Sequence, residues 1–326
     1  MKTNMNLLHI SAVALIFCTP INLVHAQAFP ARPIRIVVPN PAGTGQDVEV
    51  RQLTQHISAD LGVPIVVENR PGGSQLLGME IVAKSTPDGY TLGAGTVGNL
   101  SCHPRLFDRP SYDVERDLAP LSLSLKHPWV LYVNGSVPAQ TFQQFVALAK
   151  AKPESITYAS TGVGGFAHLT TTLLQTMTGI QLRHVPYGAQ PWQPDLLGAH
   201  VNAAMWPLIT MVDHVKSGRL RALAISNGKQ RSPQVPDVPM FSEVGLAQFD
   251  PHAWAGLVSR AGTPKPILEK LAKAAARAAQ TTQYQEFAAR NGATAIGSTP
   301  TEFDAFLKSE RARWKKVIGD NGIKLD

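Results

Sequence analysis

The chain has 326 residues, 44% of them hydrophobic, and a formal net charge of +7. A chain of this length has enough apolar residues for sizeable cores and usually divides into two domains. Its basic residues form no run of five or more, which argues against nucleic-acid binding. After the N-terminal segment no apolar stretch reaches 18 residues, so we expect no membrane-spanning helix.

Residues 1–28 have the layout of a secretory signal peptide. Lys2 stands near the start, an apolar stretch covers residues 7–17, and small residues follow it. The apolar stretch is too short to cross a bilayer. The alternative is a buried N-terminal helix. Without this segment the net charge becomes +6 and Cys102 is the one remaining cysteine, so we expect no internal disulfide.

Strand and helix patterns alternate along the rest of the chain. We expect Asp47 to cap a helix whose apolar positions run to Leu61 and which ends at Gly62. A further helix is predicted over 76–84. The alternation predicts an α/β fold with mostly parallel sheets. Predicted strands lie at 34–38, 64–68, 87–95 (with a turn), 129–133, 156–160, 182–185 and 219–225.

Two capping motifs predict later helix starts. Thr141 and Gln144 form one capping box, and Thr299 and Glu302 form a second with proline at the first helical position. In the helix after the second box, Glu310 interrupts the apolar stripe.

Two glycine-rich loops, 41–47 and 160–166, each lie between a predicted strand and a predicted helix. Loops at the carboxyl ends of strands in open α/β sheets are the usual ligand sites. The first N–H groups of a helix are unpaired and lie at the positive end of its dipole, and glycine allows a ligand to approach them closely. The natural ligand for such a loop is an anion, either phosphate or carboxylate.

Sequence motifs disfavour a nucleotide, a metal or catalysis. Gly162 and Gly164 with Ala167 fit G-x-G-x-x-A, but no acidic residue follows about 20 positions later, and there is no P-loop. We find no G-x-S-x-G or H-E-x-x-H motif and therefore expect no catalytic residues, cofactor or metal. Cys102 and its neighbour His103 are interpreted as an incidental surface pair. We interpret His168 and His184, which lack a second ligand at metal spacing, as structural or hydrogen-bonding residues.

The chain resembles the solute-binding proteins of the tripartite tricarboxylate transporter family, the Bug proteins. The resemblance covers residues 32–326 and rests on several motifs in a fixed order. These motifs include RPIRIVVPNPAG (32–43), VVENRPGG (66–73), PDGYTLGAGTVG (87–98), ITYASTGVGGFAHL (156–169), HVPYG (184–188), SGRLRALAIS (217–226), PDVPMFSEVGL (236–246) and GSTPTEFDAFLKSE (297–310).

The resemblance implies a two-domain periplasmic binding protein of the Venus-flytrap type, with a small α/β domain on each side of a cleft. The chain would cross between the domains near 127 and 252. Domain 1 would then be discontinuous, formed by 29–127 plus 253–326, and domain 2 would cover 128–252. In the family, glycine-rich loops from both domains grip the carboxyl group of a small carboxylate. We expect a monomer located in the periplasm.

The predicted ligand contacts come from the positions that match the family's loops. They are Asn40, Gly43, Thr44, Gly45, Gln46, Asp47, Ser74, Gln75, Ser160, Thr161, Gly164, Gly165, His168 and Trp206. The first loop departs from the family's usual P-P-G-G-G-T-D, since Gln46 replaces a threonine. An aspartate usual in the family aligns with Trp206, which favours an apolar or aromatic carboxylate over an amino acid. Alternatively, Trp192 and Trp206 are packing residues.

The predicted function is therefore capture of a small organic carboxylate in the interdomain cleft. The ligand would pass to a membrane transporter of the tripartite tricarboxylate type or to a sensor. One alternative is a diverged interaction module that has lost ligand binding. The other is an exported enzyme, for which the sequence shows no nucleophile and base.

Overall fold

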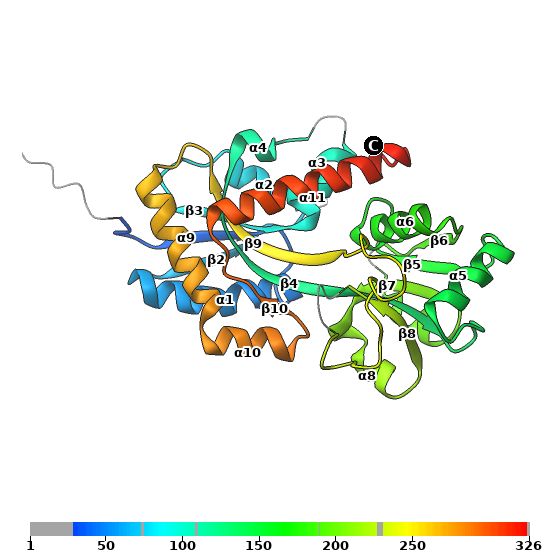
Figure 1. The fold of residues 1–326 in the computed structure, drawn as a ribbon. Helices are drawn as coiled ribbons and strands as arrows, with labels where there is room; N and C mark the ends of the chain where they lie inside the picture. The colour runs from blue at the N-terminus through cyan, green and yellow to red at the C-terminus, as the bar shows by residue number, and fades with distance from the viewer. Residues whose placement is uncertain (1–28, 73–74, 108–109, 189, 227–230, 325–326) are drawn as a thin grey trace, which may run out of the picture.

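The computed structural model describes residues 29–72, 75–107, 110–188, 190–226 and 231–324. The predicted signal peptide, 1–28, lies outside the described residues. Two α/β lobes are joined by a pair of long strands (Figure 1). The first lobe contains the N-terminal elements together with the C-terminal helices, and the second lobe is formed by the middle of the chain. This arrangement is the two-domain α/β architecture that the sequence predicted.

The strands are short except for the two that join the lobes. They are β1 (Ile34–Val38), β2 (Ile65–Asn69), β3 (Thr91–Thr96), β4 (Leu118–Asn134), β5 (Thr157–Ser160), β6 (Arg183–Pro186), β7 (Ala203–Pro207), β8 (Leu220–Ile225), β9 (His252–Arg260) and β10 (Thr294–Ala295).

Helices follow most of these strands. They are α1 (Gly45–Leu61), α2 (Leu76–Ala83), α3 (His103–Leu106), α4 (Val114–Asp117), α5 (Phe142–Ala151), α6 (Phe166–Thr178), α7 (Gln193–Leu197), α8 (Val212–Lys216), α9 (Lys265–Gln280), α10 (Thr282–Arg290) and α11 (Pro300–Asp320). A π-helical segment, η2 (Gly98–Cys102), precedes α3, and a 3₁₀ turn, η3 (Leu208–Thr210), follows β7. Among the described residues, no helix is both long and apolar enough to cross a membrane.

The sheet is mixed, so the prediction of mostly parallel sheets was wrong. β1 pairs in parallel with β2 and β3, and β5 pairs in parallel with β6 and β7. All pairings of β4 and β9 are antiparallel, and these two strands lie at the centre of the order β2-β1-β3-β9-β4-β7-β5-β6. The parallel units are thus confined to the two lobes, and the crossing strands supply the antiparallel part.

β4 extends 11 residues further toward the N-terminus than the predicted strand 129–133. Pro120 and Pro128 argue against a strand in sequence terms, because proline cannot donate to a ladder. The structure accommodates this segment with register shifts against β9, between Pro120 and Ser122 and between Leu123 and Leu125. Its N-terminal half pairs with β9 and its C-terminal half with β7 and β8. Both predicted crossings, near 127 and 252, fall on these strands, and the exact domain boundaries stay a prediction.

The helix ends follow the predicted signals in part. Gly62 adopts a left-handed conformation (φ 70°) and donates its N–H to Ser58, which ends α1 as expected. The capping box of Thr299 and Glu302 is complete at the start of α11. At α5 the box is incomplete, because the Gln144 side chain accepts from the N–H of Gln140 and not of the capping residue.

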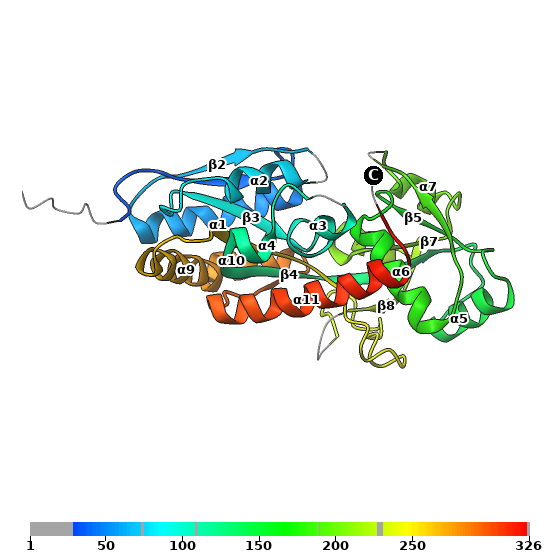
Figure 2. The same cartoon turned by 90° about the horizontal axis from the view of Figure 1, so that it is seen from above.

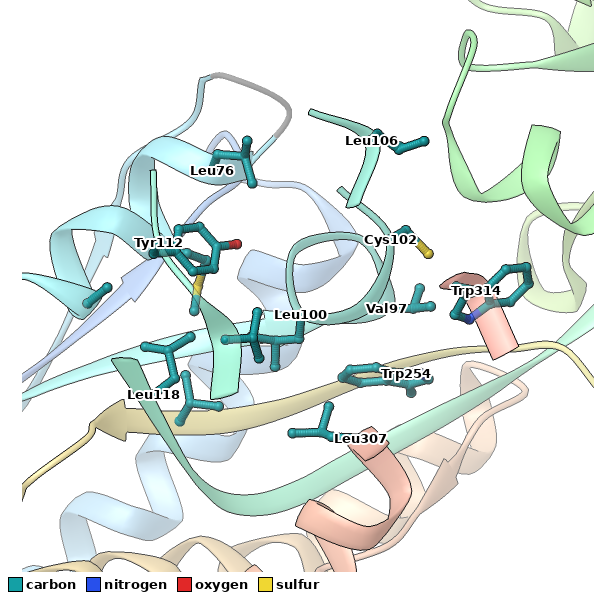
Figure 3. Packing of buried hydrophobic residues seen from close by; sticks show 14 of the residues in the cluster. Leu76, Val97, Leu100, Cys102, Leu106, Tyr112, Leu118, Trp254, Leu307 and Trp314 are labelled. Carbon is teal, nitrogen blue, oxygen red and sulfur yellow. The ribbon is translucent and has the colours of Figure 1, made fainter. Parts of the chain in front are cut away.

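Apolar clusters cover both faces of the sheet in the first lobe. On one face, α1, α9 and α10 pack over β1 and β3. On the other, α2, η2 and α11 enclose a second cluster (Figure 3) that includes Trp254 and Trp314. The view from above shows α11 extending toward α6 of the second lobe (Figure 2). A helix of each lobe therefore packs against the other beside the crossing strands.

Glu310 interrupts the stripe of α11 because its carboxylate has partners inside the core. Trp254 and Trp314 each donate an indole N–H to its Oε2 over 3.1 Å, and Arg313 lies 3.0 Å from its other oxygen. Both oxygens of this buried carboxylate therefore have partners, and the bond from Trp254 links α11 to β9.

Candidate functional site

A hydrogen-bonded polar network lies at the carboxyl ends of β1 and β3. Asn40 donates its side-chain amide to Oε1 of Gln46 over 2.5 Å, and Gln75 donates to Oδ1 of Asn40 over 3.3 Å. Thr96 donates to Oε1 of Gln75 over 3.0 Å. The structure thus brings three predicted ligand residues, Asn40, Gln46 and Gln75, to one end of the sheet, where their side chains hold one another.

The first glycine loop leads directly into α1. Gly43 has a φ of 79°, which a residue with a side chain rarely adopts. Thr44 occupies the N-cap position, but its hydroxyl donates to the carbonyl of Pro41 and does not cap the helix. The first turn of α1 therefore begins without a side-chain cap on its N–H groups.

Asp47 does not cap α1, so that prediction was wrong. It is the third residue of the helix, and its carboxylate accepts the N–H of Gly43 over 2.9 Å. Arg51 and Asn69 donate to the same carboxylate over 3.0 and 2.9 Å. Burial alone would raise the pKa of Asp47, but these hydrogen bonds outweigh it and lower the pKa below its usual value. Asp47 thus holds the conformation of the first glycine loop through its bond to Gly43.

A cavity of about 530 Å³ opens beside this loop, between the two lobes. The first turn of α1, the end of β3 and α10 contribute walls from the first lobe, and β7 with η3 contributes from the second. The crossing strands β4 and β9 form part of its lining. Four predicted ligand residues line the cavity: Gly43, Gly45, Gln46 and Trp206. The described lining includes neither Lys nor Arg.

The other predicted residues have different places. Ser74 lies outside the described residues. The residues that are described but are not among those lining the cavity are Asn40, Thr44, Asp47, Gln75, Ser160, Thr161, Gly164, Gly165 and His168. The second glycine loop therefore stays a predicted contact that this arrangement of the lobes does not bring to the cavity.

The second glycine loop is held by two stacked histidines. The rings of His168 and His184 lie 4.4 Å apart, and the backbone N–H of Gly164 donates to Nδ1 of His168 over 3.2 Å. Burial and the neighbouring His184 lower the pKa of His168 to about 4, and burial lowers that of His184. The hydroxyl of Ser160 lies 2.6 Å from Nε2 of His184, but this serine is fully buried. Both histidines are hydrogen-bonded, as predicted.

Trp192 and Trp206 differ in role. Trp192 is 2% exposed and packs edge-on against Trp206, with ring centroids 4.9 Å apart. Trp206 lies between Trp192 and Trp129 and also lines the cavity. Packing therefore accounts for Trp192, whereas Trp206 also presents an aromatic surface to the cavity.

Cys102 is not a surface residue, so the predicted surface pair was wrong. It is 1% exposed and lies near Val97, Leu106 and Trp314 (Figure 3). Burial raises the pKa of its thiol well above the usual value, and the nearby carboxylate of Glu310 adds to this. Among the described residues no group of three or more His, Cys, Asp or Glu is placed to hold a metal ion.

Sequence patterns missed several residues of the cavity. Glu49, on the first turns of α1, is 5% exposed and lines the cavity, as do His127 on β4 and Phe287 on α10. One signal was present, because Glu49 stands four residues before Leu53 and therefore on the apolar face of the helix. The other two residues come from segments whose meeting with α1 depends on the tertiary fold.

Comparisons with known proteins agree on one family. Residues 49–323 match the family described as "Tripartite tricarboxylate transporter family receptor". Protein BugT of Bordetella pertussis is 35% identical over 330 residues, covering 98% of this chain and all of BugT.

Two solved structures with bound ligands have similar folds. R. palustris Rpa4515 with adipate has a TM-score of 0.78 at 28% identity, covering 91% of this chain and 99% of that one. MatC from Rhodopseudomonas palustris with bound malate has a TM-score of 0.75 at 28% identity, covering 89% and 100%.

Proposed function

Because the chain belongs to the tripartite tricarboxylate transporter receptor family, we propose that it is an exported solute-binding protein that captures a small carboxylate between its lobes. The observation that carries this proposal is the cavity of about 530 Å³ whose wall includes the glycine loop before α1. Similar proteins with bound adipate and malate support a carboxylate as ligand.

The start of α1 supplies the groups that a carboxylate needs. Gly43 and Gly45 line the cavity, and an added Cβ at either would meet no atom within 4 Å, so the approach to the backbone is open. Unpaired N–H groups and the positive end of the helix dipole attract an anion there. Since no described Lys or Arg lines the cavity, backbone groups carry this attraction.

The second glycine loop would complete the site when the lobes close. Its glycines precede α6 as the first loop precedes α1. The N–H groups of Gly164 and Gly165 are bonded within the loop, so the groups that it would offer are those of the first turn of α6. A ligand that contacts both loops stabilises the closed form by its greater affinity for that form. After closure the loaded protein would deliver its ligand in the periplasm to a membrane transporter or a sensor.

A thermal-shift screen of the chain without residues 1–28 tests ligand binding. The panel contains adipate, malate, aromatic monocarboxylates and amino acids. A ligand that binds only the native protein raises the melting temperature with concentration, and at a hundred times its Kd it stabilises by about 2.7 kcal/mol. No shift with any acid, for protein shown to carry no co-purified ligand, would contradict the proposal and favour the interaction module.

Gly45→Val tests the first loop. The valine side chain would occupy the approach to the first N–H groups of α1, and we expect affinity for the best acid of the panel to fall at least about tenfold, since a hydrogen bond to a charged group is worth about 1.5–3 kcal/mol. Gly135→Val is the matched control, because it also has open space around its Cβ and does not line the cavity. Equal affinity in both variants would remove the first loop from the site.

A further inference from the structure

Glu49 is a buried carboxyl group that has no positively charged partner among the residues that the structure describes. Its Oε1 accepts hydrogen bonds from Ser124 on β4 over 3.1 Å and from Tyr284 on α10 over 3.4 Å. Its Oε2 has no hydrogen bond to the part of the chain that the structure describes. Burial raises the pKa of Glu49 to about 7, although both hydrogen bonds act to lower it. An ionised carboxylate in this position therefore lacks a counter-charge.

None of the elements packed around Glu49 supplies this charge. On α10, burial raises the pKa of Tyr284, which stays neutral. On β4, burial and His252 lower the pKa of His127 to about 4, so this ring is neutral as well. On α1 itself, Asp47 and Arg51 pair with each other. On α9, Arg277 pairs with Asp60.

Glu49 lies close to the first glycine loop along α1. It follows Gly45 by four residues, which is about one helical turn and about 6 Å along α1. Both residues line the same cavity, and Trp206 and Phe287 add aromatic surface to it. A ligand with its carboxylate at the start of α1 would thus have its neighbouring atoms beside Glu49 and its body against aromatic rings.

We propose that Glu49 binds an ammonium group of the ligand, so that the cavity takes an aromatic or apolar α-amino acid in preference to the corresponding simple acid. This inference rests on the proposed function, since it places the ligand's carboxylate at the first glycine loop. The ammonium supplies the counter-charge that the protein lacks and forms a charge-assisted hydrogen bond with the carboxylate.

Matched pairs of ligands test this inference. Phenylalanine, leucine and aspartate are compared by calorimetry at pH 8 with 3-phenylpropionate, 4-methylpentanoate and succinate, which lack only the amine. We expect phenylalanine or leucine to bind about tenfold to a hundredfold more tightly than its amine-free partner. In Glu49→Gln the ratio of the two affinities should fall toward one.

Failure of the inference and failure of the proposed function give different results. If an amine-free acid binds as tightly as its amino acid or more tightly, the inference is wrong and carboxylate capture stands. If the ratio in Glu49→Gln equals that of the unaltered protein, Glu49 is not the amine partner. If none of these acids binds and the wider screen is also silent, the proposed function fails as well.

A series of binding measurements at different pH tests whether Glu49 binds the ammonium group, even if Glu49→Gln does not fold. Binding of the ligand's ammonium group requires that Glu49 is ionised. The affinity of the unaltered protein for phenylalanine should therefore fall about tenfold from pH 8 to pH 6. Phenylalanine and 3-phenylpropionate do not change charge in this range, and His127 stays neutral. An affinity for phenylalanine that changes no more than that for 3-phenylpropionate would overturn the inference.

Discussion

At the residue scale, Asp47 connects the shape of the first glycine loop to the stability of the protein. One carboxylate accepts from the loop at Gly43, from its own helix at Arg51 and from β2 at Asn69. Because it is buried, its loss leaves three donors without their acceptor. The residue therefore holds the first glycine loop in place even though it does not line the cavity.

Asp47→Asn should lower the free energy of unfolding by about 1–3 kcal/mol, because the charge-assisted hydrogen bonds are lost. Denaturant titration at pH 7 measures this. The pKa of Asp47 is lowered in the folded state, so its contribution is present above pH 4 and is lost as the pH falls further. The difference between the unaltered protein and the variant should therefore shrink in acid.

Asp60→Asn is the control for that measurement. Asp60 pairs with Arg277 at the surface, and such pairs contribute about 0–1 kcal/mol. An Asp47→Asn variant no less stable than Asp60→Asn would show that the loop does not depend on this carboxylate.

At the element scale, α11 depends on how it begins. The hydroxyl of Thr299 accepts the N–H of Glu302, and the Glu302 carboxylate accepts the N–H of Thr299. From this start the helix carries Phe303 and Trp314 into the core beside β9 and toward the second lobe. The cap therefore stabilises the first turn of a helix that packs against both lobes.

Thr299→Ala should lower the free energy of unfolding by about 1 kcal/mol, the usual value for loss of an N-cap side chain. Thr301→Ala, an exposed position in the first turn of the same helix, is the matched control and should change stability by less than about 0.5 kcal/mol. Thermal and denaturant melts measure both. Equal effects of the two substitutions would contradict a capping role for Thr299.

At the scale of the whole molecule, β4 and β9 connect two lobes with the cavity between them. These strands pair along most of their length, so they form a continuous ribbon at the crossing. The second glycine loop lies outside the cavity lining, which is the arrangement expected before a ligand brings the lobes together.

Ligand binding should therefore make the protein more compact. A single compact body of about 300 residues has a radius of gyration of about 19 Å. The radius of gyration measured by small-angle X-ray scattering should be larger than this without ligand. It should decrease when a saturating acid from the thermal-shift screen is added. A radius that does not change, with saturation confirmed by calorimetry, would contradict closure around the ligand.

Local patterns in the sequence were sufficient for most of the described strands, for the helices α1, α2, α5 and α11, and for the place of the first glycine loop between a strand and a helix. The strand 34–38, the end of α1 at Gly62 and the capping box at Thr299 depend on residues that are neighbours along the chain. Such signals act over a few residues, so they can be read without the fold. The order of the motifs along the chain was also sufficient to identify the family.

Only the tertiary structure decided which side chains surround the cavity. The carboxylate of Asp47 accepts hydrogen bonds from Gly43, Arg51 and Asn69, and Asn69 lies on the strand β2. The Pro-containing half of β4 became a strand because β9, more than a hundred residues away, pairs with it. Glu49 meets Tyr284 across 235 residues of sequence. Burial and long-range contacts set the charge state and the partners of these groups, and neither can be read from neighbouring residues.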